Sequence, residues 1–199
     1  MALDFTAIDF ETANPSTASA CAVGLARVRA GRVVATAGWL IQPPPGHDDF
    51  HRGNTRIHGI RKADVAGAKR WTEQLDDLCA FAGADVLVAH NAGFDMNVLK
   101  RACDATGLAC PPYRYVCTLQ VSRKVYELAS YRLPLVAAEA GFGEFPHHDA
   151  TADAHACAQI VIDAARRVGA ADVHELAEKV GVKVSQIAAP ELVEVARVA

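Results

Sequence analysis

The sequence predicts an α/β fold, a mixed five-stranded sheet with helices on both faces. Two observations lead to this fold class. The 199 residues are 51% hydrophobic, which is enough to bury one compact core. Along the chain, three strand-like segments come first, helical and strand-like segments then alternate, and helices come last. This order is typical of three antiparallel strands followed by two parallel strands.

The three N-terminal strands are predicted from short runs of apolar and β-branched residues. They cover residues 4–10, 20–29 and 32–42. Only Ala30 and Gly31 separate the second strand from the third, a spacing that favours a tight hairpin. The segment 43–60 is rich in Pro, Gly and polar residues, so we expect a long loop there.

The rest of the chain alternates between helical and strand-like patterns. We expect helices at 71–83, 94–107, 119–130, 133–141 and 149–169, and strands at 84–90 and 113–118. Asp149 is placed to cap the longest of these helices. We expect residues 1–168 to form one domain, and residues 169–199 to form a C-terminal helical extension that is packed on this domain or trails it.

Composition limits the classes of function. The chain has 20 Lys and Arg against 23 Asp and Glu, a formal charge of -3, so no long-range positive field draws it to duplex nucleic acid. Affinity for a polyanion would have to come from a few arginines or from bound cations. The acidic start of the chain and the lack of an apolar run of about 20 residues predict a cytoplasmic protein without a membrane segment. Six cysteines without a CxxC pair are expected to be buried thiols.

Asp9, Glu11 and Asp95 are candidate catalytic residues. Asp9 and Glu11 lie two residues apart in a predicted strand, so both carboxylates point to one face at its C-terminal end. Asp95 follows the strand that ends at His90, where a helix begins. Taken singly, each has another explanation: a D-x-E pair fits an exposed strand edge, and Asp95 fits a first-turn acid favoured by the helix dipole.

Asp153 and His148 complete the set. Asp153 lies in the first turns of the last long helix, and the helix dipole alone would explain it. His148 falls in the loop before the helix cap, where it can fold back toward Asp153. A single loop histidine would otherwise indicate no function.

Taken together, the four carboxylates can converge on one edge of the sheet, where they would repel one another unless cations bind. Their oxygen atoms suit Mg²⁺ or Mn²⁺, and two such ions can hold the attacking and leaving oxygens of a phosphodiester. A histidine with an ordinary pKa of about 6.5 can take a proton from the attacking water. We therefore predict a phosphodiester hydrolase with two divalent cations and His148 as general base. The predicted metal ligands are Asp9, Glu11, Asp95 and Asp153.

Three segments resemble the exonuclease motifs of the DEDDh family, whose best-known branch is the proofreading epsilon subunit of bacterial DNA polymerase III. They are AIDFETA, HNAGFD and HDATADA, and the similarity spans residues 5–165 in the family's order. RIHGI and CTLQVSRKVYELASYRLPLVAAEAGF are also similar to family segments. The resemblance implies a ribonuclease H-like fold, two-metal catalysis and 3′→5′ release of 5′-mononucleotides. The expected substrates are single-stranded 3′ ends, with DNA favoured over RNA.

The resemblance also implies where the terminal nucleotide binds. Relatives hold it near the backbone that corresponds to Thr12, with Phe10 and Phe94 nearby, and we add Asn91 of the second motif as a substrate-binding candidate. Core packing is the simpler explanation for both phenylalanines. The first motif continues as Ala-Asn-Pro at 13–15, where many relatives have a small residue and Gly, so the choice of substrate stays open.

Other polar clusters have simpler explanations. His47, Asp48, Asp49 and His51 resemble a metal cluster, but in a Pro/Gly-rich loop we expect them to be solvated. QLDDLC faintly resembles a sliding-clamp peptide, but its leucines fit an amphipathic core helix. A polymerase or sliding-clamp partner therefore stays unproven.

His147 and His155 could join His148 in binding zinc, although helical spacing turns His155 away from Asp153. Two other functions also stay open. A binding module could use the fold as a scaffold for nucleic acid, but it would have no reason to gather four mutually repelling carboxylates. A hydrolase of short oligonucleotides would use the same ions in a closed pocket.

Overall fold

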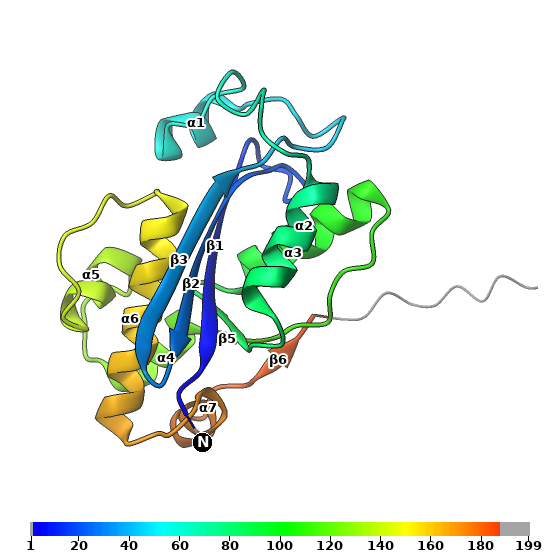
Figure 1. Ribbon diagram of the computed structural model, residues 1–199. Coiled ribbons are helices and arrows are strands. Elements are labelled where there is room, and N and C mark those ends of the chain that lie inside the picture. Colours follow the sequence, from blue (N-terminus) through cyan, green and yellow to red (C-terminus); the bar gives the residue numbers. More distant parts are fainter. Residues whose placement is uncertain (1, 188–199) are drawn as a thin grey trace, which may run out of the picture.

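The computed structural model describes residues 2–187, which form a single mixed sheet with helices on both faces (Figure 1). The strand order is β3-β2-β1-β4-β5-β6. β1 pairs antiparallel with β2, β2 antiparallel with β3, and β4 runs parallel to both β1 and β5. The strands are β1 Phe5–Thr12, β2 Ala20–Arg29, β3 Arg32–Leu40, β4 Leu87–Ala89, β5 Arg114–Cys117 and β6 Ser185–Gln186. The predicted α/β class is confirmed, and so is the prediction of three antiparallel strands followed along the chain by two parallel strands.

The helices form two layers. α2 and α3 lie on one face of the sheet, and α4, α5, α6 and α7 cover the other face (Figure 1). Their bounds are α1 Arg52–His58, α2 Trp71–Ala82, α3 Gly93–Thr106, α4 Thr118–Val125, α5 Leu133–Glu139, α6 Ala150–Val168 and α7 Val173–Val180. No helix of the described chain is both long enough and apolar enough to cross a membrane.

β1 is the central strand, and its alternation divides the core in two. Phe5 and Ala7 face the layer that contains α6, whereas Ile8 and Phe10 face α2 and α3. All four side chains are buried, and each large apolar side chain contributes roughly 1.5–3 kcal/mol when fully buried. The same alternation turns Asp9 toward the α6 side, so the packing of the strand decides where its carboxylate points.

The β2–β3 hairpin turns through two residues with positive φ, Ala30 at 49° and Gly31 at 71°. This is the backbone of a two-residue hairpin turn whose twist matches that of the strands. The hairpin predicted from the Ala30-Gly31 link is therefore confirmed.

The prediction of a plain loop over 43–60 is wrong at its second half, which contains α1. The His51 side chain caps this helix by accepting from the Gly53 amide, and Gly59 ends it at φ 80°. None of its seven residues is buried. The helix therefore leaves no amphipathic pattern in the sequence, and local capping together with contacts to β1 determines it.

The five-strand prediction also needs correction, because β6 adds a sixth strand antiparallel to β5. Two paired residues are too few to give a periodic pattern. The strand forms because the chain after α7 returns to the sheet, where the Ile187 amide donates to the Tyr113 carbonyl at 3.0 Å. In the segment called an extension, α7 packs into the α6 side of the core. Residues 188–199 lie outside the described part of the chain.

Candidate active site

Two carboxylates lie at the C-terminal end of β1. Asp9 and Glu11 both line one groove, as the alternation of the strand requires. The register with β2 shifts between Glu11 and Thr12, a bulge of the kind that redirects side chains at the end of a strand. One carboxylate oxygen each from Asp9, Glu11 and Asp153 lies within 4.8 Å of the others.

Asp95 lies beneath this cluster in the first turn of α3. Its side chain is 1% exposed. Its Oδ1 accepts a hydrogen bond from the Phe10 amide at 3.0 Å, because β4, which leads into α3, pairs with β1. Its Oδ2 is buried and has no hydrogen-bond partner among the described residues. A buried ionised oxygen without a partner is costly, so this atom is a natural cation ligand.

Close packing places the N-terminus of α6 over the sheet. A Cβ atom added at Gly24 would lie 2.0 Å from the Ala150 carbonyl oxygen, and one at Gly38 would lie 1.9 Å from Thr151 Oγ1. The two glycines therefore allow α6 to begin directly against β2 and β3. Asp149 caps the helix by accepting from the Ala152 amide, as predicted.

Asp153 receives hydrogen bonds from the loop before α6. It is 3% exposed. The His148 amide donates to Oδ2 at 3.0 Å, and His147 Nδ1 lies 2.9 Å from Oδ1 and 3.1 Å from Oδ2. The loop therefore fixes the orientation of this carboxylate, and His147 has a direct contact that was not predicted from the sequence.

His148 takes an unusual backbone conformation, with φ 70°. The imidazole rings of His147 and His148 are stacked, with centroids 3.8 Å apart. His148 is half-buried and lines the groove. Burial, together with the neighbouring charge of His147, lowers the pKa of His148 below its ordinary 6.5, although Asp153 opposes the shift. The histidine is thus neutral and able to accept a proton near pH 7.

The acids raise one another's pKa. Burial is the largest cause for Asp9, Glu11 and Asp95, and the charges of the neighbouring carboxylates add to it. The pKa of Glu11 rises to about 8, as does that of Asp95. Such a crowded set of acids stores electrostatic energy that bound cations would release.

The groove has a volume of about 890 Å³, and α1 forms one of its walls. Asn54 Nδ2 donates to the Thr12 carbonyl oxygen at 3.0 Å and to Thr12 Oγ1 at 3.1 Å. His58 Nε2 lies 3.1 Å from the same carbonyl oxygen. These contacts attach α1 to the end of β1, next to Glu11. Exposed Ile57 of α1 then faces the groove, as do Phe94 of α3 and Leu135 of α5.

Three of the four predicted substrate-binding residues line the groove. Phe10, Thr12 and Phe94 line the groove, whereas Asn91 is not among its lining residues. Asn91 has φ 70°, and its carbonyl accepts from the Phe94 amide at the start of α3. Phe10 is buried against Trp71, with ring centroids 6.0 Å apart, so the core-packing explanation holds for it. Phe94 is 39% exposed and is free to stack on a base.

The sequence did not single out several other residues of the groove. They are Asn54, Ile57, His58, His90, Arg132, Leu133, Pro134 and Leu135. The family-like segments RIHGI and YRLPL contained six of these residues, and that similarity was the only signal available for them.

Two alternative sites lose support, and the zinc alternative loses His155. His147 and His148 do form, with Asp153, a group that could hold a metal ion. His47, Asp48 and His51 contact Ser16, Lys62 and the Gly53 amide, respectively. The loop acids and histidines are not among the metal-like clusters of the described residues. His155 packs on Phe142, with ring centroids 4.8 Å apart, and it does not line the groove. In QLDDLC, Leu75 and Leu78 are buried in the core and face away from any partner.

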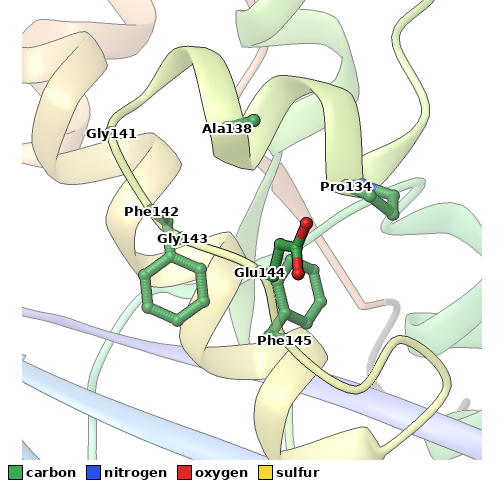
Figure 2. Close-up of a pocket in the computed structure, with 7 residues that line it drawn as sticks. All are labelled: Pro134, Ala138, Gly141, Phe142, Gly143, Glu144 and Phe145. Carbon is green, nitrogen blue, oxygen red and sulfur yellow. The ribbon is translucent and has the colours of Figure 1, made fainter.

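A second hollow of about 600 Å³ adjoins the groove and shares Pro134 with it. It lies between α5 and the loop that follows, and Figure 2 shows the Glu144 carboxylate projecting toward α5. Phe142 and Phe145 lie beside it with ring centroids 5.4 Å apart. The hollow has an acid and no basic lining residue, so it is unsuited to a phosphate.

Comparison with known proteins decides the family. The model of the exonuclease family RNase_T matches residues 6–161. The chain belongs to this exonuclease family. The resemblance to DEDDh exonucleases inferred from three short motifs is thus confirmed, and with it the assignment to a family of nucleic-acid hydrolases.

Two relatives illustrate the range of exonuclease-family proteins that contain such a domain. A Mycobacterium tuberculosis protein named for a bifunctional exonuclease/endonuclease activity is 31% identical over 185 residues, which cover 87% of this chain and 28% of that protein. The PolC-type DNA polymerase III of Thermotoga maritima is 27% identical over 177 residues, 86% of this chain and 13% of the polymerase. The chain therefore spans only a small part of these relatives.

Solved exonuclease structures share the fold. Exonuclease X, solved with a 5′-overhanging duplex DNA, has a TM-score of 0.69 at 24% identity, covering 89% of this chain and 99% of that one. The nuclease domain of 3′hExo, described as a DEDDh family member bound to rAMP, has a TM-score of 0.72 at 13% identity, covering 93% and 97%. These likenesses confirm the ribonuclease H-like fold.

Proposed function

We propose that this chain is a two-metal 3′→5′ exonuclease that releases 5′-mononucleotides from single-stranded nucleic acid, DNA in preference to RNA. The observation that carries the proposal is the group of four acids, from β1, α3 and α6, gathered at one end of the sheet. Membership of the exonuclease family supports it. A scaffold without catalysis would have no use for this costly arrangement of like charges.

The residues fit divalent cations. Asp9, Glu11 and Asp153 can share one ion through oxygens within 4.8 Å of one another, and the unpartnered Oδ2 of Asp95 can serve a second. Carboxylate oxygens suit Mg²⁺ or Mn²⁺. Such ions would neutralise the charge that develops on a phosphodiester during hydrolysis.

In this proposal His147 and His148 have different roles. His148 lines the groove with a lowered pKa, so it is the general base that takes the proton from the attacking water. His147 contacts Asp153, so it is a positioning residue that holds this carboxylate in place. Asp153 in turn accepts from the His148 amide, which fixes the loop that carries both rings.

Polarity depends on the closed end of the groove. Phe10 directly follows Asp9 and packs on Trp71, and Thr12 directly follows Glu11 and is held by Asn54 of the α1 wall. A strand that enters past Phe94 would meet the α1 wall, with Ile57, after its last nucleotide, which favours a free 3′ end over an internal bond. One structural neighbour was solved with DNA and another with rAMP. These complexes support a nucleic-acid substrate and are compatible with both deoxyribose and ribose.

The context of the domain is also a proposal. We propose residues 1–168 as the exonuclease domain and residues 169–199 as an extension, of which α7 packs into the core. PolC-type polymerases among the relatives favour a polymerase as partner. A clamp peptide at Gln74–Cys79 is not part of this proposal, since its leucines are buried.

The test compares oligonucleotides labelled at the 5′ end: single-stranded DNA, duplex DNA and RNA, each in Mg²⁺, in Mn²⁺ and in EDTA. We expect a ladder of products shortened by one nucleotide, formed fastest on single-stranded DNA and absent in EDTA. A 3′-phosphate should slow the reaction strongly, whereas a 5′-phosphate should not. Efficient cleavage of circular single-stranded DNA would refute the exonuclease assignment, and activity only on di- or trinucleotides would favour an oligonucleotide hydrolase.

A further inference from the structure

The groove is strongly asymmetric in charge. Its lining includes Asp9, Glu11 and Asp153 on the side of β1 and α6. Among the described residues that line it, Arg132 is the only Lys or Arg. A polyanion that reaches the acids therefore passes a single fixed positive charge, apart from any cations held by the acids themselves.

The backbone at Arg132 is held firmly where α5 begins at the groove. Arg132 is the N-cap residue of α5, with φ -67° and ψ 143°, and its carbonyl accepts from the amides of Leu135 and Val136. The preceding Tyr131 carbonyl lies 2.8 Å from His90 Nε2, and the following Leu133 is buried in the core. Both neighbours thus tie this position to the end of β4 and to the core, so the stem of the arginine starts from a fixed point.

The side chain of Arg132 has no structural role that its contacts reveal. Its guanidinium makes no ion pair or hydrogen bond with another residue in the described part of the chain, and its side chain is exposed. Arg132 therefore faces the groove without a described partner inside the protein.

Its surroundings indicate what it would bind. Leu135, one turn into α5, is 51% exposed and lines the same groove, as does Ile57, 56% exposed, from α1. Apolar rims suit nucleobases, and a guanidinium suits the phosphate between them, which it can contact with two parallel N–H donors. The adjoining hollow with Glu144 offers no alternative phosphate site.

We propose that Arg132 binds a phosphate of the substrate strand on the 5′ side of the terminal linkage, and so makes the groove prefer a chain of nucleotides over a single nucleotide ester. This inference rests on the proposed exonuclease function. It adds a sequence-independent contact to a protein whose net charge is negative. In this proposal the cations held by the acids bind the scissile phosphate, and Arg132 does not contact it.

The test compares wild type with Arg132→Ala, Arg132→Lys and, as a matched control, Arg32→Ala, which removes an exposed arginine at the opposite end of β3. One substrate is the p-nitrophenyl ester of thymidine 5′-monophosphate, which has a single phosphodiester. The other is a 12-nucleotide oligothymidylate. For Arg132→Ala we expect a roughly tenfold loss of kcat/KM on the oligonucleotide, mainly through KM, and less than about a twofold change on the ester.

The salt dependence gives a second readout. Loss of one phosphate contact should make the slope of log(kcat/KM) against log[salt] less steep by about 0.7. Arg132→Lys should recover the slope, because the charge remains, but only part of the affinity. A neutral methylphosphonate moved along the strand should weaken wild type at one linkage and leave Arg132→Ala unaffected there.

Three outcomes would overturn the proposal. An equal loss on ester and oligonucleotide would place Arg132 at the scissile phosphate or in the fold, and melting curves would distinguish these two cases. No loss on the oligonucleotide, or a loss equal to that of Arg32→Ala, would mean that Arg132 does not contact the strand. If wild type hydrolysed neither substrate, the proposed function would fail instead. Fluorescence anisotropy of the labelled oligonucleotide in Ca²⁺ would then still compare its binding to wild type and to Arg132→Ala.

Discussion

The substitution Asp95→Asn tests two effects of the acidic cluster separately, its effect on the stability of the metal-free protein and its contribution to catalysis. The asparagine keeps the volume of the side chain, and its Oδ1 can still accept from the Phe10 amide. Its new NH₂ group occupies the place of the unpartnered Oδ2, where it can donate to the neighbouring carboxylates. We expect nuclease activity to fall at least a hundredfold, while the metal-free protein becomes more stable.

The size of the stabilisation follows from the pKa of Asp95, which burial raises from 3.8 to about 8. Because the folded pKa exceeds the unfolded one, the contribution of this group is fully present below pH 3.8 and is lost as the pH rises through 8. Each pKa unit corresponds to about 1.4 kcal/mol. Relief of a single unit would therefore raise Tm by roughly 3–6 °C in a domain of this size.

The measurement is thermal unfolding of wild type and Asp95→Asn in EDTA at pH 5.0 and pH 8.5. The advantage of the variant should grow between the two pH values. In millimolar Mn²⁺ the order should reverse, because wild type gains more from ion binding. A variant that is less stable than wild type in EDTA at pH 8.5 would refute the argument that these carboxylates destabilise the empty site.

The remaining predictions concern the base, the ions and the position of α6. His148→Ala should lower kcat by roughly a hundredfold or more, and His147→Ala should lower it less; a larger loss for His147→Ala would mean that His147 is the base. The acidic limb of the wild-type kcat/KM profile should lie below pH 6.5, because the pKa of His148 is lowered. Mn²⁺ binding at pH 7 should release protons, since the pKa of Glu11 is about 8. Calorimetry in buffers of different ionisation enthalpy measures this release, and identical heats in all buffers would contradict it. Gly24→Ala should destabilise the protein by about 1–3 kcal/mol and lower activity, because its Cβ would meet the Ala150 carbonyl oxygen. Gly67→Ala, where a Cβ meets nothing within 4 Å, is the control, and equal unfolding curves for the two variants would show that the contact at Gly24 is not restrictive.

Much of the architecture was predictable because its signals are local. The Ala30-Gly31 turn, the cap at Asp149 and the period-2 alternation that turns Asp9 and Glu11 to one side each depend on a few neighbouring residues. The structure retains all of them. α1 and β6 were missed for the converse reason, since a helix without a buried face and a strand of two residues leave no pattern in the sequence.

In the candidate site, too, some features have local signals in the sequence and others do not. Its chemistry, four acids and a histidine, was readable from three short motifs. Their convergence on one edge of the sheet was also predicted, but not the contacts that produce it, which are the pairing of β1 with β4 and the close approach of α6 at Gly24 and Gly38. The contact of His147 with Asp153 was not predicted, because it depends on how the loop before α6 folds back on the helix. The position of Arg132 in the groove depends on the docking of α5, which no local pattern reports.

The sequence by itself therefore determined which side chains are available, the periodicity of the elements that carry them and the family to which the chain belongs. Only the tertiary structure decided that His147 contacts Asp153, that α1 closes one side of the groove and that Arg132 lines the same groove as the acids. The physical reason is that local patterns follow from backbone conformation and the burial of one face. The meeting of distant residues follows from strand register and helix docking, which are set by the packing of the whole core.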